Sequence, residues 1–232
     1  MAKSYRTLVF RLRALTNLHA GSGDSFYGAV DKLVQRDAAT NRPVIHSHSL
    51  KGALREFFEQ EGTSLNGFTN RVFGTPVDGR PEDARPGAYR FFSAELLALP
   101  VPEEDPAKSE AYHLATDDDV ISEVQKRFES LGWKTKDFKL AVQGNGPNLK
   151  SNLAERFREG VLELPVVARN CLDNGKSVNL WYEEFVPRES VFVFAIQVDD
   201  DAAEFLSGLR HKVIQIGANA TVGYGYCEIT LL

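Results

Sequence analysis

The order of hydrophobic patterns along the 232-residue chain predicts an α+β fold. The first segment, "RTLVFRLRAL", alternates apolar and polar side chains, as a half-exposed strand does. Helical spacing follows at Leu50, Leu54 and Phe57, and the later run "SVFVFAIQV" is apolar on both faces. The complete order is strand, helix, strands, strand, helix, strand, which is the ferredoxin-like (RRM-like) βαββαβ order with long insertions. We therefore expect a single domain over residues 1–232.

The first strand is followed by a loop and then by a helix. The stretch "HAGSGDSFYGAVD" predicts a loop because it has three glycines in eight residues. The next stretch, "KLVQRD", predicts a short strand. The helix is expected to start near Leu50 with Ser47 or Ser49 as its cap, and to stop near Gly62.

Two insertions are expected in the middle of the chain. Residues at about 62–87 are rich in glycine, proline and charge, which predicts an irregular insertion. The segment "AYRFFSAELLALPV" then predicts a strand. A second insertion, at about 100–160, contains "TDDDVISEVQKRFESLGW", a helix with carboxylates at its positive end.

The last third predicts a hairpin and the rest of the sheet. Two strand-like runs surround the Asp-Asn-Gly turn at 173–175, which is a strong hairpin signal. The run "SVFVFAIQV" predicts a central strand, and "DDAAEFLSGLRHK" predicts a short helix. Two final strands, "VIQIG" and "YCEITLL", are separated by the glycine-rich "GANATVGYG". The aromatic signature of a standard RRM is absent.

The net charge of −5 argues against a nucleic-acid-binding protein. The charge is unevenly spread, however. Residues 78–119 contain eleven acids against four bases, whereas residues 31–58 contain five bases against three acids. A local basic surface in an acidic protein is therefore compatible with the sequence.

The sequence also indicates a compartment. No stretch reaches the roughly 18 apolar residues that a membrane helix needs, and the N-terminal run reads as a strand rather than a signal peptide. The two cysteines, Cys171 and Cys227, lie far apart and form no CxxC motif. We expect a cytoplasmic protein with reduced, buried thiols.

The stretch "HSHSLKGALREFF" at 46–58 suggests an anion site. A helix start offers free N–H groups and a partial positive charge, and Lys51 and Arg55 share one face because they are four residues apart. A capped surface helix with solvated charges is the alternative. A metal site at His46 and His48 is a weaker reading, because this pair supplies only two ligands.

Two glycine-rich loops are further candidates. The first lacks the G-K-[ST] of a P-loop and the context of a Rossmann turn, but it holds Asp24 and Asp31 with His19 before it. A loop carboxylate can hold Mg²⁺, although most such residues are caps or turn residues. In the second loop, Gly217, Gly223 and Gly225 allow positive φ and the close approach of a ligand.

Taken in order, the motifs resemble a known family. The segments "GAVDKLVQRD", "NRPVIHSHSLKGALR" and "IQIGANATVGYG" resemble the RAMP proteins of type III CRISPR effector complexes. The pieces "SAELLALPV" and "LWYEEFVP" resemble in particular the repeated backbone subunit of the Cmr (type III-B) complex. The similarity spans nearly the whole chain.

The resemblance implies a ferredoxin-like palm and a protruding thumb hairpin, here at about 163–188. Such subunits stack into a filament along a CRISPR RNA, with other copies and other Cmr-type subunits as partners. The thumb interrupts the duplex of guide and target single-stranded RNA at regular intervals. A loop aspartate, which falls on Asp31, cleaves the target with a divalent metal, Mg²⁺ or Mn²⁺.

The resemblance also implies a set of RNA-binding residues. They are Ser47, Ser49, Lys51, Arg55, Gly217, Gly223, Tyr224 and Gly225. The family's usual "IPGSSLKG" reads "IHSHSLKG" here, so the geometry of the helix start is expected to differ.

Two rival functions stay open at the level of sequence. In the first, the chain is a structural RNA-binding subunit and Asp31 is a turn residue. In the second, it is a processing endoribonuclease that uses His19, His46 or His48 as acid and base without a metal.

Overall fold

The structure is a computed structural model of the whole chain. It describes residues 5–23, 29–61, 67–75, 85–105, 107–144, 146–199, 202–210 and 212–232. The candidate Asp24 lies outside the described residues.

A nine-stranded sheet forms the centre of the molecule, in the order β10-β11-β1-β9-β4-β5-β6, with β2 paired to β4 and β3 paired to β9. Its strands are β1 Arg6–Ala14, β2 Val44–Ile45, β3 Arg90–Phe91, β4 Ala94–Pro102, β5 Tyr112–Thr116, β6 Leu149–Lys150, β9 Val191–Val198, β10 Val213–Gln215 and β11 Tyr226–Leu231. The pairs are antiparallel, except that β5 and β6 run parallel. The predicted central strand is β9, which lies between β1 and β4.

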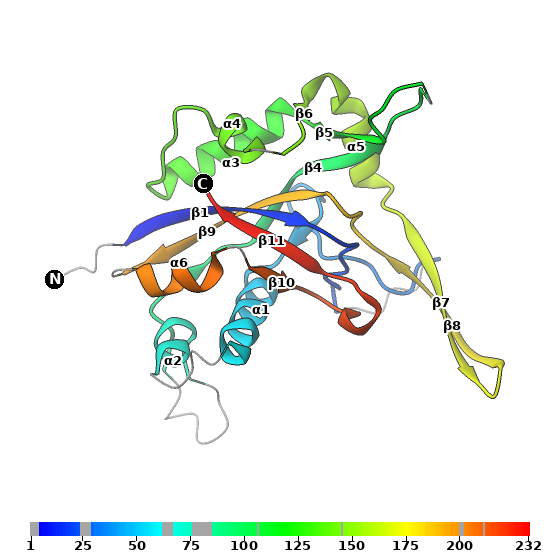
Figure 1. Cartoon of the computed structure of the whole chain (residues 1–232), viewed down its shortest axis with the longest axis horizontal. Helices are drawn as coiled ribbons and strands as arrows, with labels where there is room; N and C mark the ends of the chain where they lie inside the picture. Colours follow the sequence, from blue (N-terminus) through cyan, green and yellow to red (C-terminus); the bar gives the residue numbers. More distant parts are fainter. Residues whose placement is uncertain are drawn as a thin grey trace.

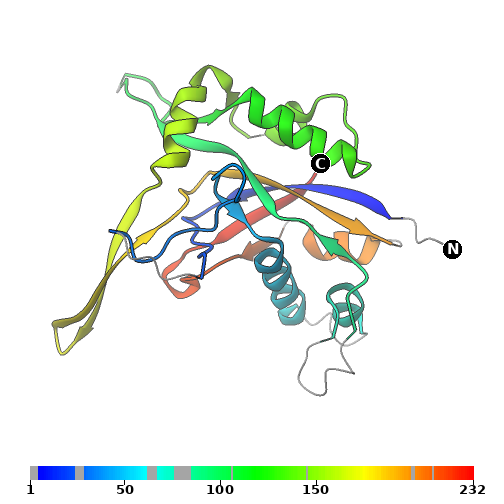
Figure 2. The same cartoon turned by 180° about the vertical axis from the view of Figure 1, so that it is seen from behind.

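The helices cover both faces of this sheet. They are α1 Ser47–Gln60, α2 Phe68–Phe73, α3 Asp118–Ser130, α4 Phe138–Gln143, α5 Ala154–Leu162 and α6 Ala203–Leu209, with short 3₁₀ turns at Ser151–Leu153 and Ala220–Val222. Helices α1, α2 and α6 lie on one side of the sheet, and α3 and α4 lie on the other (Figures 1 and 2). The path β1-α1-β4 and β9-α6-β11 confirms the ferredoxin-like βαββαβ core.

Aromatic side chains fill the layer between the sheet and its two core helices. The rings of Phe10 and Phe194, on β1 and β9, stack with centroids 5.1 Å apart. Phe58 of α1 stacks on Phe205 of α6 at 5.2 Å, and both are fully buried. Large buried rings of this kind contribute much of the hydrophobic free energy of folding. They fix α1, and with it the predicted anion site, against the sheet.

The predicted hairpin forms a separate two-stranded sheet of β7 Val166–Asp173 and β8 Lys176–Glu184. It projects away from the body of the molecule (Figure 1). Asn174 and Gly175 have φ of 49° and 77°, as a two-residue hairpin turn requires at both central positions. We call β7 and β8 the thumb.

Three expected elements differ from the structure. The stretch "KLVQRD" is not a strand but makes isolated bridges to three different segments, Lys32 to Glu183, Val34 to Gly21 and Arg36 to Pro43. The insertion at 62–87 contains α2. The strand expected at 88–101 is divided into β3 and β4, which both pair with β9 on either side of a break at residues 92–93.

The start of α1 also corrects the expectation. The helix begins at Ser47 rather than near Leu50, its N-cap is His46, and no side chain caps it. The Ser49 hydroxyl accepts a hydrogen bond from Gln35 Nε2 at 2.8 Å, so it is engaged with the preceding segment. The Ser47 N–H donates to the Ser93 hydroxyl at 3.2 Å. Neighbouring segments therefore fix this helix start in place of a serine cap.

The two thiols differ in their surroundings. Cys227 is buried, and burial raises the pKa of its thiol to about 12, but Cys171 is exposed on the thumb, contrary to the expectation. No helix among the described residues is long and apolar enough to cross a membrane.

Candidate active-site cleft

Three segments that are distant in sequence meet at the base of the thumb. They are the loop after β1, the end of β8 and the glycine loop before β11 (Figure 1). Together they line a cleft of about 560 Å³. Its lining is His19, Gly21, Ser22, Gly23, Asp31, Lys32, Leu33, Glu183, Ala218 and Asn219.

Asp31 is exposed at this cleft and is held by the thumb. Its carboxylate Oδ2 accepts a hydrogen bond from the Tyr182 N–H at 2.8 Å. The backbone N–H groups of Asp31 and Lys32 donate in turn to the Tyr182 carbonyl oxygen, at 3.0 and 3.1 Å. Within the described part of the chain, Oδ1 receives no hydrogen bond, so one carboxylate oxygen is left for a ligand.

Glu184 fastens the same loop from beneath. Its buried carboxylate accepts the Val34 N–H at 3.0 Å and the Arg36 guanidinium at 2.7 Å, and its own N–H donates to the Lys32 carbonyl at 2.9 Å. Because the charge is paired and hydrogen-bonded, its burial is tolerated. The loop that carries Asp31 is thus attached to β8 from both sides.

Glu183 joins the thumb to the glycine loop. It is 1% exposed and accepts hydrogen bonds from Arg169 Nε at 3.1 Å and from the Asn219 amide. Lys32 Nζ lies 4.0 Å from its other oxygen. Adjacent residues of a strand point to opposite faces, so two buried acids in a row indicate that both faces of the thumb base are covered. The segment "LWYEEFVP" carries the family resemblance in the sequence, but it does not show by itself that Glu183 and Glu184 are buried.

His19 is the one candidate histidine in the cleft lining. It is buried, and its Nδ1 lies 2.6 Å from the Glu184 carbonyl oxygen, which can only accept. Nδ1 therefore carries a proton, and Nε2 is the acceptor in the neutral ring. The rings of His46 and His48 stack on each other at 5.6 Å at the start of α1, outside this lining. The structure thus brings Asp31 and His19 together and leaves the other two histidines apart.

The glycine loop has the expected backbone but a different reason for it. Gly217, Gly223 and Gly225 have φ of 84°, 82° and 81°. A Cβ at Gly217 would lie 2.4 Å from the His19 carbonyl oxygen, and one at Gly225 would lie 2.0 Å from that of Ile216. The close neighbours at these two positions are the protein's own backbone, not a ligand. A Cβ at Gly223 would meet no atom within 4 Å.

Tyr224 belongs to the framework of the cleft. Its ring packs edge-on against Phe185 at 6.0 Å, and the Arg169 guanidinium lies 4.6 Å from its centroid. This arrangement ties the glycine loop to both sides of the thumb base.

The predicted cations on α1 differ in their surroundings. The Arg55 guanidinium donates to the Gly74 carbonyl at 3.0 Å and to Glu59 at 2.7 Å, which holds α2 against α1. Lys51 is half-buried and has no hydrogen-bond or ion-pair partner among the described residues. The first-turn N–H groups of a helix have no partner inside it. Lys51 is therefore the better placed of the two for an external phosphate.

The cleft offers few ligands for a divalent metal. The described residues contain no group of three or more His, Cys, Asp or Glu side chains that could hold one. Asp31 offers one free oxygen, whereas Glu183 is engaged by Arg169 and Asn219. Mg²⁺ is commonly bound by one or two carboxylates together with waters and substrate phosphates. Asp31 fits a site of that shared kind.

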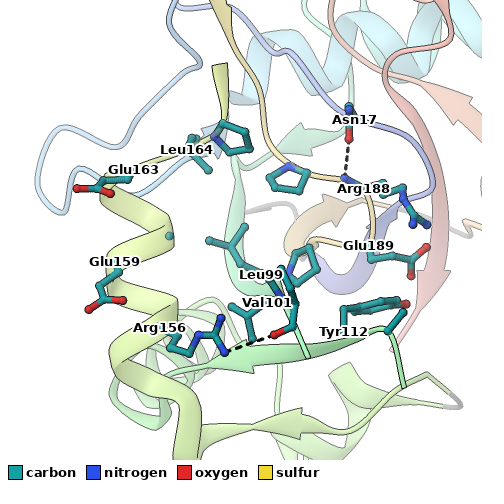
Figure 3. A pocket seen from close by; sticks show the side chains of 16 residues that line it. Asn17, Leu99, Val101, Tyr112, Arg156, Glu159, Glu163, Leu164, Arg188 and Glu189 are labelled. Atoms are coloured by element: carbon teal, nitrogen blue, oxygen red, sulfur yellow. Dashed lines mark hydrogen bonds between the residues drawn. The ribbon is translucent and has the colours of Figure 1, made fainter. Parts of the chain in front are cut away.

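A second hollow, of about 590 Å³, lies between α5, β4 and the segment before β9 (Figure 3). Leu99 and Val101 contribute to its apolar floor, while Glu159, Glu163 and Glu189 lie around it. Arg156 and Arg188 also line this hollow, so the charge of its rim is mixed. None of the predicted site residues lines it.

The sequence is related to a described family and to two named proteins. A family model described as the RAMP superfamily matches residues 11–228. The chain is 27% identical over 283 residues to the "CRISPR system Cmr endoribonuclease Cmr4" of Pyrococcus furiosus, covering 95% of this chain and 94% of that protein. It is 37% identical over 99 residues to the "CRISPR system CMR subunit Cmr4" of Saccharolobus solfataricus, covering 42% of this chain and 30% of that protein.

Solved structures share the fold. A chain of the type III-B Cmr-beta complex bound to cognate target RNA superposes with a TM-score of 0.75 at 20% identity, with 97% of each chain covered. Oligomeric Cmr4 from Pyrococcus furiosus superposes with a TM-score of 0.67 at 22% identity, with 99% of each chain covered.

Proposed function

Because the chain belongs to the RAMP superfamily, we propose that it is a CRISPR RNA-binding backbone subunit of a type III-B effector complex, and that it cleaves complementary target RNA at regular intervals. One observation carries the cleavage: the Asp31 carboxylate is held at the thumb base by Tyr182, with one oxygen free toward a cleft. The relative from Pyrococcus furiosus, named as an endoribonuclease, supports the activity.

The guide RNA would be gripped at the start of α1. The Ser47 N–H is taken by Ser93, but among the described residues no acceptor takes the N–H groups of His48 and Ser49. Lys51 follows within the first two turns of the helix. Phosphate contacts of this kind position an RNA without reading its sequence. The net charge of −5 is no obstacle, since a filament subunit needs only one basic face.

The thumb would separate guide from target. Its two strands carry exposed apolar side chains, among them Leu172, Val178, Leu180 and Tyr182. Apolar side chains that enter between base steps unstack them at a cost of a few kcal/mol per step. Such a wedge would turn one target nucleotide toward the cleft, and copies of the subunit in a filament would repeat it.

In the proposed reaction, the target's 2′-oxygen attacks the adjacent phosphorus as the P–O5′ bond breaks. The products are a 2′,3′-cyclic phosphate and a 5′-hydroxyl. Asp31 would hold Mg²⁺ or Mn²⁺ together with RNA phosphate oxygens, and the metal would neutralise phosphate charge and activate the attacking group. The hydrogen bond from Tyr182 orients the carboxylate for that task.

One observation favours a second candidate function. His19 lies in the same cleft, and its Nδ1–H donates to the Glu184 carbonyl. The neutral ring therefore has one defined tautomer, in which Nε2 can accept a proton. A metal-independent nuclease would use it. Cleavage of CRISPR precursor RNA in the presence of EDTA would select this processing endoribonuclease.

The decisive variant is Asp31→Asn in the assembled complex with its guide RNA. Asparagine keeps the shape and the acceptor for the Tyr182 N–H but removes the charge. We expect target cleavage to be lost while assembly and guide binding are retained. Asp119→Asn, on the exposed start of α3, is the matched control and should cleave normally. Undiminished Mg²⁺-dependent cleavage by Asp31→Asn would leave the chain as a structural subunit.

A further inference from the structure

Lys32 lies next to Asp31 in the cleft and is fixed there by its backbone. Its N–H donates to the Tyr182 carbonyl at 3.1 Å, and its carbonyl accepts the Glu184 N–H at 2.9 Å. The position of its Cα is thus determined by the thumb, as that of Asp31 is. Among the residues that line the cleft, Lys32 is the one lysine or arginine.

The ammonium of Lys32 is held in place but makes no hydrogen bond to a described residue. It lies 5.0 Å from the centroid of the Trp181 ring and 4.0 Å from a Glu183 oxygen. The second distance is too long for a hydrogen bond, and the Glu183 charge is already balanced by Arg169 at 3.1 Å. In the described part of the chain, no acceptor takes any of its three N–H donors. Its side chain is 54% exposed, so a ligand in the cleft can reach it.

The chemistry of the cleft gives such a cation a task. When a 2′-oxygen adds to phosphorus, negative charge builds up on the non-bridging oxygens of the phosphate. Asp31 and Glu183 are both acidic and would repel that charge. A lysine held beside them offsets the repulsion and stabilises the transition state, as fixed cations do in phosphoryl transfer.

We propose that Lys32 is a catalytic residue that binds a non-bridging oxygen of the scissile phosphate in target RNA. The proposal rests on the function proposed above. In the step that it assists, the 2′-O–P bond forms and the P–O5′ bond breaks. The 2′-hydroxyl proton passes to water, and the 5′-oxygen takes a proton from water. Lys32 stays protonated throughout and contributes charge, not a proton.

The test uses Lys32→Met and Lys32→Arg in the assembled complex. Methionine keeps a long apolar stem against Trp181 and removes the charge, whereas arginine restores the charge. We expect Lys32→Met to slow single-turnover cleavage by about 100-fold with target binding unchanged, and Lys32→Arg to recover most of the rate. Lys126→Met, on the exposed face of α3, is the matched control and should cleave at the wild-type rate.

A purely structural role is tested by substituting sulfur for a non-bridging oxygen at the cleavage site. If Lys32 binds that oxygen, the substitution slows the wild type more than it slows Lys32→Met. Equal slowing of both proteins, or a Lys32→Met protein that cleaves at the wild-type rate while Asp31→Asn is inactive, would overturn the role of Lys32 alone. Normal cleavage by both Lys32→Met and Asp31→Asn would overturn the proposed function itself.

Discussion

At the scale of single residues, the glycines of the glycine loop are required for two separate reasons, which are a positive φ and the lack of space for a Cβ atom. Gly217 and Gly223 have nearly the same positive φ. Only Gly217 is pressed against another segment, at the His19 carbonyl. The sequence shows both as glycines in a loop and cannot distinguish them, because the contact is made across about 200 residues of chain.

Alanine substitution should separate the two demands. Gly223→Ala adds only the strain of a left-handed backbone, about 1 kcal/mol of the free energy of unfolding. Gly217→Ala adds the same strain and a backbone clash, so we expect a loss of about 3 kcal/mol or more. Chemical denaturation of the purified variants measures both. Equal losses would show that the loop can move away from His19.

The roles of other cleft residues could not be predicted from the sequence, because their partners are also distant along the chain. Asp31 could be assigned because a family resemblance covers its loop. The roles of Glu183 and Glu184 depend on partners in the loop after β1 and in the glycine loop, and only the fold brings these together. The sequence predicted Ser49 as a possible helix cap, but its hydroxyl accepts a hydrogen bond from the Gln35 side chain instead.

At the scale of elements, patterns that depend on neighbours in sequence were predictive. The apolar run of β9 and the Asn-Gly turn of the thumb each specify local structure, and each is present. The alternation of β1 predicted a strand correctly, but the strand is not half-exposed, because α4 covers its second face where Arg11 donates to the Gln143 carbonyl. The stretch "KLVQRD" has a strand-like composition but no continuous partner, so it forms single bridges. A strand is defined by the segment that it pairs with, and that information is not local.

The thumb provides a prediction at this scale. We expect that trimming residues 172–178 to a two-residue turn leaves the subunit folded and bound to guide RNA, because Leu172 and Val178 are exposed. Target cleavage should become weak or lose its regular spacing, since the wedge no longer reaches between bases. Mapping of cut sites on a labelled target RNA measures this.

A length-preserving control identifies the cause. Leu172→Ser with Val178→Ser keeps the reach of the thumb and removes its apolar tip. A defect in the trimmed protein alone would assign the effect to length, and a defect in both would assign it to apolar contact. A wild-type ladder of fragments from both proteins would place the wedge elsewhere in the chain.

At the scale of the whole molecule, the net negative charge is compatible with an RNA partner because the charged residues are unevenly distributed. The candidate guide contact is confined to one helix start, whereas residues 78–119 contain eleven acids against four bases. Affinity for RNA depends on the few cations that meet phosphates and release counterions, not on net charge.

Salt dependence tests this reading. Lys51→Ala should weaken guide binding for every sequence and reduce the log–log salt slope by about 0.7, the value for one lost phosphate contact on a single strand. Lys134→Ala, an exposed lysine after α3, is the matched control and should leave the slope unchanged. Arg55→Ala should act on stability instead, since its guanidinium holds the Gly74 carbonyl. An unchanged slope for Lys51→Ala would make Lys51 an ordinary solvated charge.

The attachment of Asp31 to Tyr182 has one more consequence. Both backbone and side chain of the aspartate are hydrogen-bonded to a residue of the thumb, so the distance between the thumb and the cleaving carboxylate is fixed. The number of nucleotides between a displaced base and the broken bond would then be set by the protein and not by the guide sequence. Copies of the subunit along one RNA would therefore measure out fragments of constant length.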